Sequence, residues 1–271
     1  MYIADYHTHS NCSIDGSSTM TEMARAAIDA GLDEICITDH VDTIIWNSTK
    51  RRGAHDWSQT IAQYRDACDA LGDKIKIRLG AEFGETGIHP DLARENMASA
   101  PPLDFVIGSV HTAAARNDWA DFYYIDSREE AHWYDVIDGY LDEVERLLQI
   151  GDFDVLGHLT LPLRYANEHK GMHLSFERFY DRADAIFRRL IETGRGIECN
   201  TNRGNTPLPD APLLRRYRAL GGEIITLGSD AHTTDQVGCC IRERQSLLRE
   251  CGFTHFCTFE ARRPIFHTID I

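Results

Sequence analysis

Three features that mark common classes of partner are missing from this chain of 271 residues. Basic charge is not in surplus: Lys and Arg number 28 against 43 Asp and Glu, which gives a net charge of −15. Long-range repulsion from that charge disfavours nucleic acid and anionic membrane surfaces as partners. No apolar run approaches the roughly 20 residues that span a bilayer. The N-terminus also lacks the basic-then-apolar pattern of a secretory signal. We therefore expect a cytoplasmic protein that binds neither nucleic acid nor membranes.

Cysteine pairs with metal-ligand spacing are also missing. None of the eight cysteines forms a CxxC pair, so a zinc site built from thiolates has no support. In a chain of this size without a secretory signal, reduced thiols are expected rather than disulfides. Cys36 and Cys199 lie inside apolar runs and are predicted to be core residues.

No linker, low-complexity segment, internal repeat or glycine-rich dinucleotide fingerprint interrupts the sequence. Short apolar runs instead alternate with helical patterns from end to end, and seven of them have the nearly continuous apolar character of buried parallel strands. These runs cover residues 2–7, 34–40, 76–83, 104–111, 153–159, 195–201 and 223–230. Such alternation indicates βαβ units with right-handed crossovers. We expect one α/β domain over residues 1–271, a closed barrel related to the TIM barrel rather than an open sheet.

Three helices between these runs have recognisable ends. A capping-box pattern runs from Thr19 to Glu22, and Gly31 closes that helix. A second capping-box pattern, Ser127 to Glu130, precedes a long apolar stripe that ends at Gly151. A third stripe, 176–191, stops at Gly194.

The carboxyl ends of the predicted strands carry metal-ligand residues. They are His7, His9, Asp15, Asp39, His40, Glu82, His111, His158, Glu198, Asn200, Asp230 and His232. In a parallel barrel all of these ends open onto one face, where such enzymes hold their active sites. Residues i and i+2 of a strand point the same way, so His7 and His9 can aim two donors at one centre.

Each of these signals is weak alone, because a single strand-end histidine is more often packed or hydrogen-bonded than a ligand. Apolar strands, however, give no structural reason for nearly every one to end in His, Asp or Glu. Imidazoles and carboxylates that converge without thiolates are ligands that Zn, Mn or Fe accept. The pattern therefore predicts a metal centre.

The motifs that carry these residues resemble, in order, those of the PHP (polymerase and histidinol phosphatase) family. They read HTHS (7–10), ITDH (37–40), GAEF (80–83), GSVH (108–111), GHL (157–159) and GSDAH (228–232). Four longer stretches, 5–16, 153–165, 197–201 and 225–232, are similar to the monofunctional histidinol-phosphatases, and the likeness covers essentially the whole chain.

This resemblance implies a distorted (β/α)7 barrel with two to three divalent ions in three ligand groups. The implied groups are His7, His9 and Asp230; Glu82 as a bridge, with His111 and His158; and Asp15, His40 and His232. Some relatives carry His where this chain has Asp15, and an oxygen donor favours Mn or Fe over Zn at the third position. Asp39 and Glu198 are expected either to orient ligands or to cap strand ends.

Arginines on the same face are the candidate phosphate-binding groups. Arg164 follows the fifth predicted strand and Arg203 the sixth, and guanidinium forks match phosphate oxygens. The basic residues Lys50, Arg51 and Arg52, with His55, are expected to form either a lid edge or an exposed charge run. Three further loop histidines are weaker substrate-contact candidates: His89, His169 and His173.

The resulting expectation is a histidinol-phosphatase that hydrolyses L-histidinol phosphate to L-histidinol and phosphate. A metal-bridging hydroxide would attack phosphorus, and Asp230 or His232 would assist the leaving group. Two alternatives stay open at this point. One is a phosphodiesterase or exonuclease on the same barrel, and the other is a non-enzymatic, metal-stabilised binding module.

Overall fold

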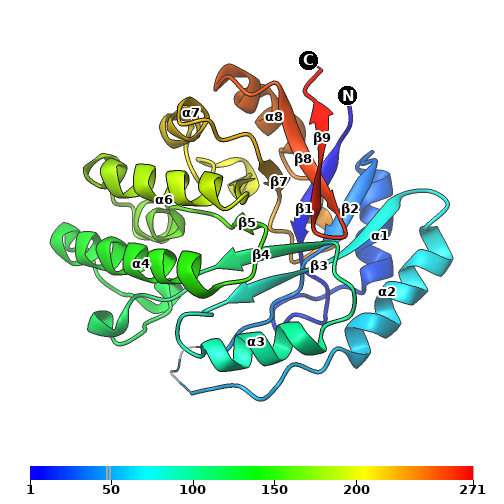
Figure 1. Ribbon diagram of the computed structural model, residues 1–271, viewed down its shortest axis with the longest axis horizontal. Helices are drawn as coiled ribbons and strands as arrows, with labels where there is room; N and C mark the ends of the chain where they lie inside the picture. The colour runs from blue at the N-terminus through cyan, green and yellow to red at the C-terminus, as the bar shows by residue number, and fades with distance from the viewer. Residues whose placement is uncertain (47, 49, 271) are drawn as a thin grey trace.

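Seven parallel strands form one sheet in strict sequence order, β1 to β7, in the computed structural model of the chain (Figure 1). The structure describes residues 1–46, 48 and 50–270. The strands are β1 (Ala4–Thr8), β2 (Glu34–Ile37), β3 (Lys76–Gly84), β4 (Phe105–Ser109), β5 (Val155–Leu156), β6 (Gly196–Asn200) and β7 (Ile225–Gly228).

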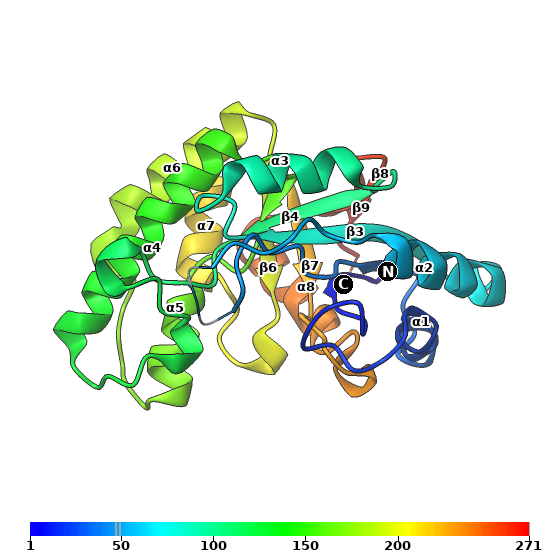
Figure 2. The same ribbon diagram turned by 90° about the horizontal axis from the view of Figure 1, so that it is seen from below.

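Helices follow the strands and cover the outside of the sheet. They are α1 (Met20–Asp29), α2 (Ser58–Leu71), α3 (Pro90–Ser99), α4 (Glu130–Ile150), α5 (Leu161–Leu163), α6 (Tyr180–Glu192), α7 (Ala211–Ala219) and α8 (Ile241–Glu250). Figure 2 shows α1 and α2 at one end of the sheet and α4 and α6 side by side at the other. In the described part of the chain, no helix has the length and apolar content needed to cross a membrane.

The sheet curls until its first and last strands meet just past their carboxyl ends. The His9 amide donates to the Ala231 carbonyl over 2.8 Å, and the Asp230 amide donates to the His7 carbonyl over the same distance. The outcome is a nearly closed barrel of seven parallel strands, so the expected distorted (β/α)7 barrel is confirmed. Closure at this end draws the loop after β7 directly against the loop after β1.

The core follows from sequence periodicity. Strand residues are buried on both faces, as parallel strands covered by helices must be. The longest helix, α4, buries one stripe at helical spacing against the sheet: Trp133, Val136, Ile137, Tyr140, Leu141, Val144, Leu147 and Leu148. Cys36 and Cys199 are fully buried, as predicted.

One of the two predicted capping boxes forms and the other does not. Thr19 Oγ1 accepts from the Glu22 amide, and the Glu22 carboxylate accepts from the Thr19 amide over 2.7 Å. The box predicted at Ser127 is wrong, because α4 begins at Glu130. Ser127 Oγ accepts from the Glu129 amide, two residues on, while its carbonyl accepts from the Trp133 indole. The same residue pattern thus stabilises a turn before the helix.

An antiparallel hairpin, β8 (His255–Glu260) and β9 (Arg263–Thr268), follows the seventh strand and was not predicted. Its two turn residues, Ala261 and Arg262, have φ values of 48° and 63°. Such a turn normally uses Asn or Gly, so the sequence carries no hairpin signal here. Tertiary contacts compensate, because both turn amides donate to Asp104, over 3.0 and 2.9 Å.

The hairpin seals the amino end of the barrel, opposite the strand ends that carry the metal-ligand residues. The buried Tyr6 hydroxyl donates to Glu34 Oε1 over 2.5 Å and accepts from the Phe259 amide of β8 over 2.9 Å. Arg78 of β3 donates to the same Glu34 carboxylate over 3.0 Å. One hydroxyl therefore connects β1, β2 and the hairpin.

We expect Tyr6→Phe to destabilise the protein by about 2 kcal/mol, because it leaves a buried amide and a buried carboxylate oxygen short of a partner. The melting temperature should fall by roughly 4–8 °C. Tyr2→Phe is the matched control, since Tyr2 also donates to Glu34 over 2.5 Å but is only partly buried. Equal stability of Tyr6→Phe and the parent, by urea and thermal denaturation, would contradict this account of the seal.

Candidate metal centre

Five imidazoles surround one buried carboxylate at the carboxyl end of the barrel. Glu82 Oε1 lies 2.9 Å from His158 Nε2 and 3.2 Å from His111 Nε2. Its second oxygen, Oε2, lies 3.2 Å from His7 Nε2, 3.5 Å from His9 Nε2 and 3.0 Å from His40 Nδ1. Glu82 itself is completely buried. Residues from four strand ends thus meet around a single anionic group.

A second carboxylate, Asp230, lies beside the first. Its Oδ1 is 3.6 Å from His7 Nε2 and 3.4 Å from His9 Nε2. Its backbone is in the left-handed region at φ 58°, which Asp tolerates better than most residues. That turn follows β7 directly and brings the Asp230 side chain beside the two β1 histidines.

The remaining predicted ligands lie nearer the surface. His232 Nε2 is 2.8 Å from Asp15 Oδ2, and His40 Nε2 is 3.8 Å from Asp15 Oδ1. The rings of His9 and His232 stack with centroids 4.3 Å apart. All nine predicted ligand residues are therefore brought together, from Glu82 at the bottom to the exposed Asp15 at the rim.

A glycine permits this density of side chains. A Cβ on Gly228 would lie 2.3 Å from Glu198 Oε1 and 2.4 Å from the Cβ of His7. Any larger residue at the end of β7 would displace either the β1 histidine or the Glu198 carboxylate beside it. The glycine of the GSDAH motif is thus required by packing.

Glu198 contacts the histidine cluster directly, and Asp39 is linked to it through Ser13. Glu198 Oε1 accepts from His7 Nδ1 over 2.7 Å, and Oε2 accepts from the His158 amide over 2.7 Å. Asp39 reaches the cluster indirectly, because it accepts from Ser13 Oγ over 2.9 Å. That hydroxyl lies 3.1 Å from His9 Nδ1.

The carboxylates and imidazoles of the cluster shift one another's pKa values strongly. Burial by itself raises the pKa of Glu82, but His7, His40 and His111 outweigh it and hold that pKa well below its usual range. Burial lowers the pKa of His40, yet the Glu82 and Asp42 carboxylates raise it to about 9. His9 differs: burial, His232 and His40 together lower its pKa to about 3.

Several buried ring nitrogens of the cluster, and one oxygen of Glu82, have no hydrogen-bond partner. They include His7 Nε2, His9 Nε2, His40 Nδ1, His158 Nδ1 and Glu82 Oε2. Leaving such atoms unpaired in a protein interior costs free energy, which a bound cation removes. In five groups of three residues, the ligand atoms lie within 4.8 Å of one another: His7, His9 and Asp230; His7, Glu82 and His158; His40, Glu82 and His111; His9, His40 and His232; and Asp42, Glu85 and His111. The donors therefore fit several divalent ions of the Zn, Mn or Fe type.

A cavity of about 410 Å³ opens directly above the cluster. Both predicted phosphate-binding arginines line it, and Arg164 Nη1 lies 3.4 Å from Asp230 Oδ2. Arg164 begins a π-helical turn, Arg164–His169, whose last residue also faces the cavity. The rest of the wall includes residues that the sequence analysis did not single out: Ile44, Trp46, Glu85, Asp121, Tyr123, Tyr124 and Tyr165.

Two acidic residues next to the centre were missed. Glu85 accepts from the His111 amide over 2.5 Å, and its Oε2 lies 3.4 Å from His111 Nδ1. Asp42 Oδ1 is 3.9 Å from His40 Nδ1 and has no hydrogen-bond partner. Each follows a predicted ligand by two or three residues, so extending the strand-end search a few positions into the loops would have found both.

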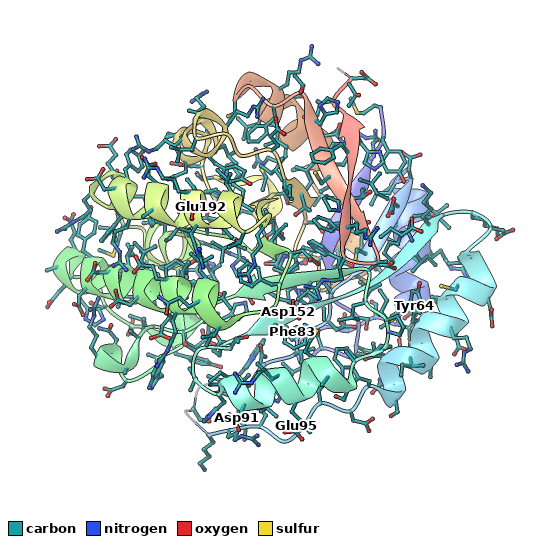
Figure 3. All side chains as sticks on the ribbon, in the orientation of Figure 1. Tyr64, Phe83, Asp91, Glu95, Asp152 and Glu192 are labelled. Carbon is teal, nitrogen blue, oxygen red and sulfur yellow. The ribbon has the colours of Figure 1, made fainter. Side chains whose placement is uncertain are left out.

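Other predicted candidates lie away from the cavity. Of the basic run after β2, Arg51 pairs with Asp91 Oδ2 over 3.1 Å. Figure 3 shows Asp91 and Glu95 projecting from α3 away from the barrel. Ile44 and Trp46 of this loop line the cavity, whereas its charged residues do not. Among the described residues that line the cavity, His169 is present, but His55, His89 and His173 are absent.

Comparisons with known proteins agree with this geometry. The PHP domain matches residues 5–202, more than half of the chain. A histidinol-phosphatase of Lactococcus lactis is 30% identical over 268 residues, which cover 96% of this chain and 95% of that protein.

Solved structures are also similar to this chain. The L. lactis histidinol phosphate phosphatase, solved with zinc, L-histidinol and phosphate, superposes with a TM-score of 0.78 at 25% identity, covering 97% of this chain and 98% of that one. A Listeria monocytogenes protein shares the fold with a TM-score of 0.72 at 16% identity, covering 87% of this chain and 97% of that one. From its motifs, its barrel and these matches, the chain belongs to the PHP domain family, alongside the histidinol-phosphatases of that family.

Proposed function

We propose that this protein is a metal-dependent phosphate monoester hydrolase and that its substrate is L-histidinol phosphate. The observation that carries the proposal is Glu82, ringed by five imidazoles beneath a cavity that Arg164 and Arg203 share. The likeness to the L. lactis enzyme over nearly its full length supports the substrate. We also propose that residues 1–271 act as one phosphoesterase domain.

The ligand groups are those that the PHP resemblance implies, and one of them, His7, His9 and Asp230, is also a group whose ligand atoms lie within 4.8 Å of one another. We assign the first ion to His7, His9 and Asp230, the second to Glu82, His111 and His158, and the third to Asp15, His40 and His232. Glu82 is suited to bridge two ions because each of its oxygens faces different imidazoles. Glu198 and Asp39 then hold ring orientation, Glu198 directly at His7 Nδ1 and Asp39 through Ser13.

The chain's own residues account for substrate binding and proton movement. Bound divalent ions lower the pKa of a water molecule and neutralise phosphoryl charge. Arg164 and Arg203, which both line the cavity, would bind phosphoryl oxygens. The leaving alkoxide needs a proton, and Asp230 or His232, which both line the cavity, would assist it.

The remaining wall of the cavity suits a small cationic and aromatic leaving group. Glu85 and Asp121 are acidic, and Trp46, Tyr123 and Tyr165 are aromatic. An ammonium group and an imidazole would find opposite charge and ring faces there. Nucleic acid would meet the net charge of −15 instead, which disfavours the exonuclease alternative. A non-enzymatic role is disfavoured because all nine predicted ligands are present and close together.

A substrate panel tests the activity. We expect turnover of histidinol phosphate, slower turnover of phenyl phosphate and none of a phosphodiester, because the cavity offers a phosphate clamp beside acidic and aromatic groups. Phosphate release is the measurement, with and without a chelator. Preferential hydrolysis of the diester would overturn the monoesterase assignment, and chelator-insensitive turnover would overturn the metal requirement.

Metal content tests the centre itself. Elemental analysis should find two to three transition-metal ions per chain, and their removal should lower the melting temperature because they bind only the folded state. His9→Ala combined with Glu82→Ala should lose most of this metal. His173→Ala is the matched control, an exposed loop histidine that should keep full occupancy. Stoichiometric metal in the double variant would rule out this ligand set.

Arginine substitutions test the phosphate clamp. A charged hydrogen bond contributes about 1.5–3 kcal/mol, so Arg164→Ala or Arg203→Ala should lower kcat/KM by roughly 10- to 150-fold with metal content unchanged. Lysine should restore only part of the loss, because an ammonium lacks the two-pronged geometry. Arg51→Ala, outside the cavity, is the control. Equal losses on histidinol phosphate and phenyl phosphate indicate phosphate contact, whereas full activity in both alanine variants excludes the clamp.

A further inference from the structure

Cys239 and Cys240 are the one pair of adjacent cysteines in the sequence. Their sulfur atoms lie 3.7 Å apart, at van der Waals contact, and both residues are partly exposed. Cys240 immediately precedes α8 and has the left-handed φ of 59°. Because that conformation strains a residue with a Cβ, this dipeptide is held by its surroundings rather than by its own preference.

Cys239 is joined through the backbone to the metal-centre loop. Its amide donates to the Gln236 carbonyl over 3.0 Å. The side-chain oxygen of Gln236 in turn accepts from the His232 amide over 3.1 Å. A change in the backbone at Cys239 is therefore transmitted through one residue to His232.

Cys240 contacts the turn that carries Arg203. A Cβ on Gly204 would lie 3.1 Å from Cys240 Sγ, so the sulfur rests directly on that glycine. One helical turn later, Arg244 Nη2 donates to the Thr201 carbonyl over 3.1 Å and also to the Asn205 carbonyl. The start of α8 is thus held to the Arg203 turn by the packing of Cys240 and by the hydrogen bonds of Arg244.

We propose that Cys239 and Cys240 form an oxidisable vicinal dithiol that hydrogen peroxide converts to a disulfide. One sulfur attacks peroxide, the O–O bond breaks, and a sulfenic acid and water result. The second sulfur then attacks the first, the S–S bond forms, the S–O bond breaks and a second water leaves. Two electrons pass from the two thiols to the peroxide, and no further reactant is needed.

The geometry makes this disulfide easy to reduce again. Disulfide sulfurs lie about 2.05 Å apart and usually join Cα atoms 4.4–6.8 Å apart. Adjacent Cα atoms across a trans peptide are only about 3.8 Å apart. Bringing the two sulfur atoms from 3.7 Å to bonding distance therefore requires the backbone of residues 239–240 to rearrange. Strained disulfides of this kind are the labile ones, which suits a reversible modification.

Formation of the disulfide should weaken phosphate binding, because the rearranged backbone packs against the Arg203 turn and is hydrogen-bonded through Gln236 to His232. This consequence rests on the proposed function, whereas formation of the disulfide does not. Burial and the neighbouring Cys240 thiol raise the pKa of Cys239 to about 11, so little thiolate is present near neutral pH and the oxidation requires peroxide in excess.

The test uses the metal-loaded enzyme treated with a graded excess of hydrogen peroxide and then digested with trypsin after free thiols are alkylated. The tryptic peptide 219–242 contains these two cysteines and no other. We expect it to escape alkylation and to lie 2 Da below its reduced mass, and dithiothreitol should restore the thiols. With unchanged metal content, KM for phenyl phosphate should rise by about tenfold, the loss of one charged hydrogen bond.

Matched serine variants separate the dithiol from the other cysteines. C239S and C240S should keep their untreated activity and show no peroxide-dependent rise in KM, whereas C68S, altered at a partly buried cysteine on α2, should respond like the parent. Two alkylated thiols, or sulfonic acids, in peptide 219–242 would overturn the disulfide whatever the enzyme hydrolyses. A disulfide that leaves KM unchanged, or an equal KM rise in C239S, would overturn its link to the Arg203 turn.

Discussion

The attraction between one buried carboxylate and five imidazoles organises this protein. A charged group in a protein interior must be compensated, because it has lost its hydration. Glu82 meets that requirement with His7, His9, His40, His111 and His158, which come from several strand ends. None of these imidazoles is a neighbour of Glu82 in sequence. The cluster can therefore form only when the barrel has closed, so the site depends on the complete fold.

The two ends of the barrel carry out separate tasks. At the carboxyl end, donor atoms crowd so closely that Gly228 cannot carry a side chain, and several of them lack hydrogen-bond partners. At the amino end, the Tyr6 hydroxyl, Glu34 and the hairpin form a fully paired network. The stability lost through unpaired polar atoms at the carboxyl end is thus offset by the hydrogen-bonded network at the amino end. This division is what an enzyme needs to hold a destabilising site in a stable frame.

An acidic protein that binds an anion must concentrate positive charge locally. The net charge of −15 gives a phosphate ester no general attraction. Two arginines face the cavity, and the clustered donors below it fit divalent ions. Arg203 lies on a turn that packs against Cys240, so the proposed phosphate clamp and the proposed dithiol lie next to each other. Substrate attraction and redox sensitivity would then share one structural element.

Local patterns in the sequence determined the strands, their parallel order and the donors at their ends. Strand-end position and the period-two geometry of a strand are properties of a few consecutive residues, so His7 with His9 could be recognised without a structure. Asp230 and His232 could be recognised from position alone, because they lie in the turn beyond β7, where Asp230 has a left-handed φ of 58°. Distances between strands depend on barrel curvature and closure, which no local pattern encodes. Tertiary structure alone therefore decided which Glu82 oxygen faces which imidazole, and it brought Glu85 and Asp42 beside the centre. It also decided the hairpin, whose Ala261–Arg262 turn is held by Asp104 rather than by its own residues, and the start of α4, where Ser127 serves a turn instead of a cap.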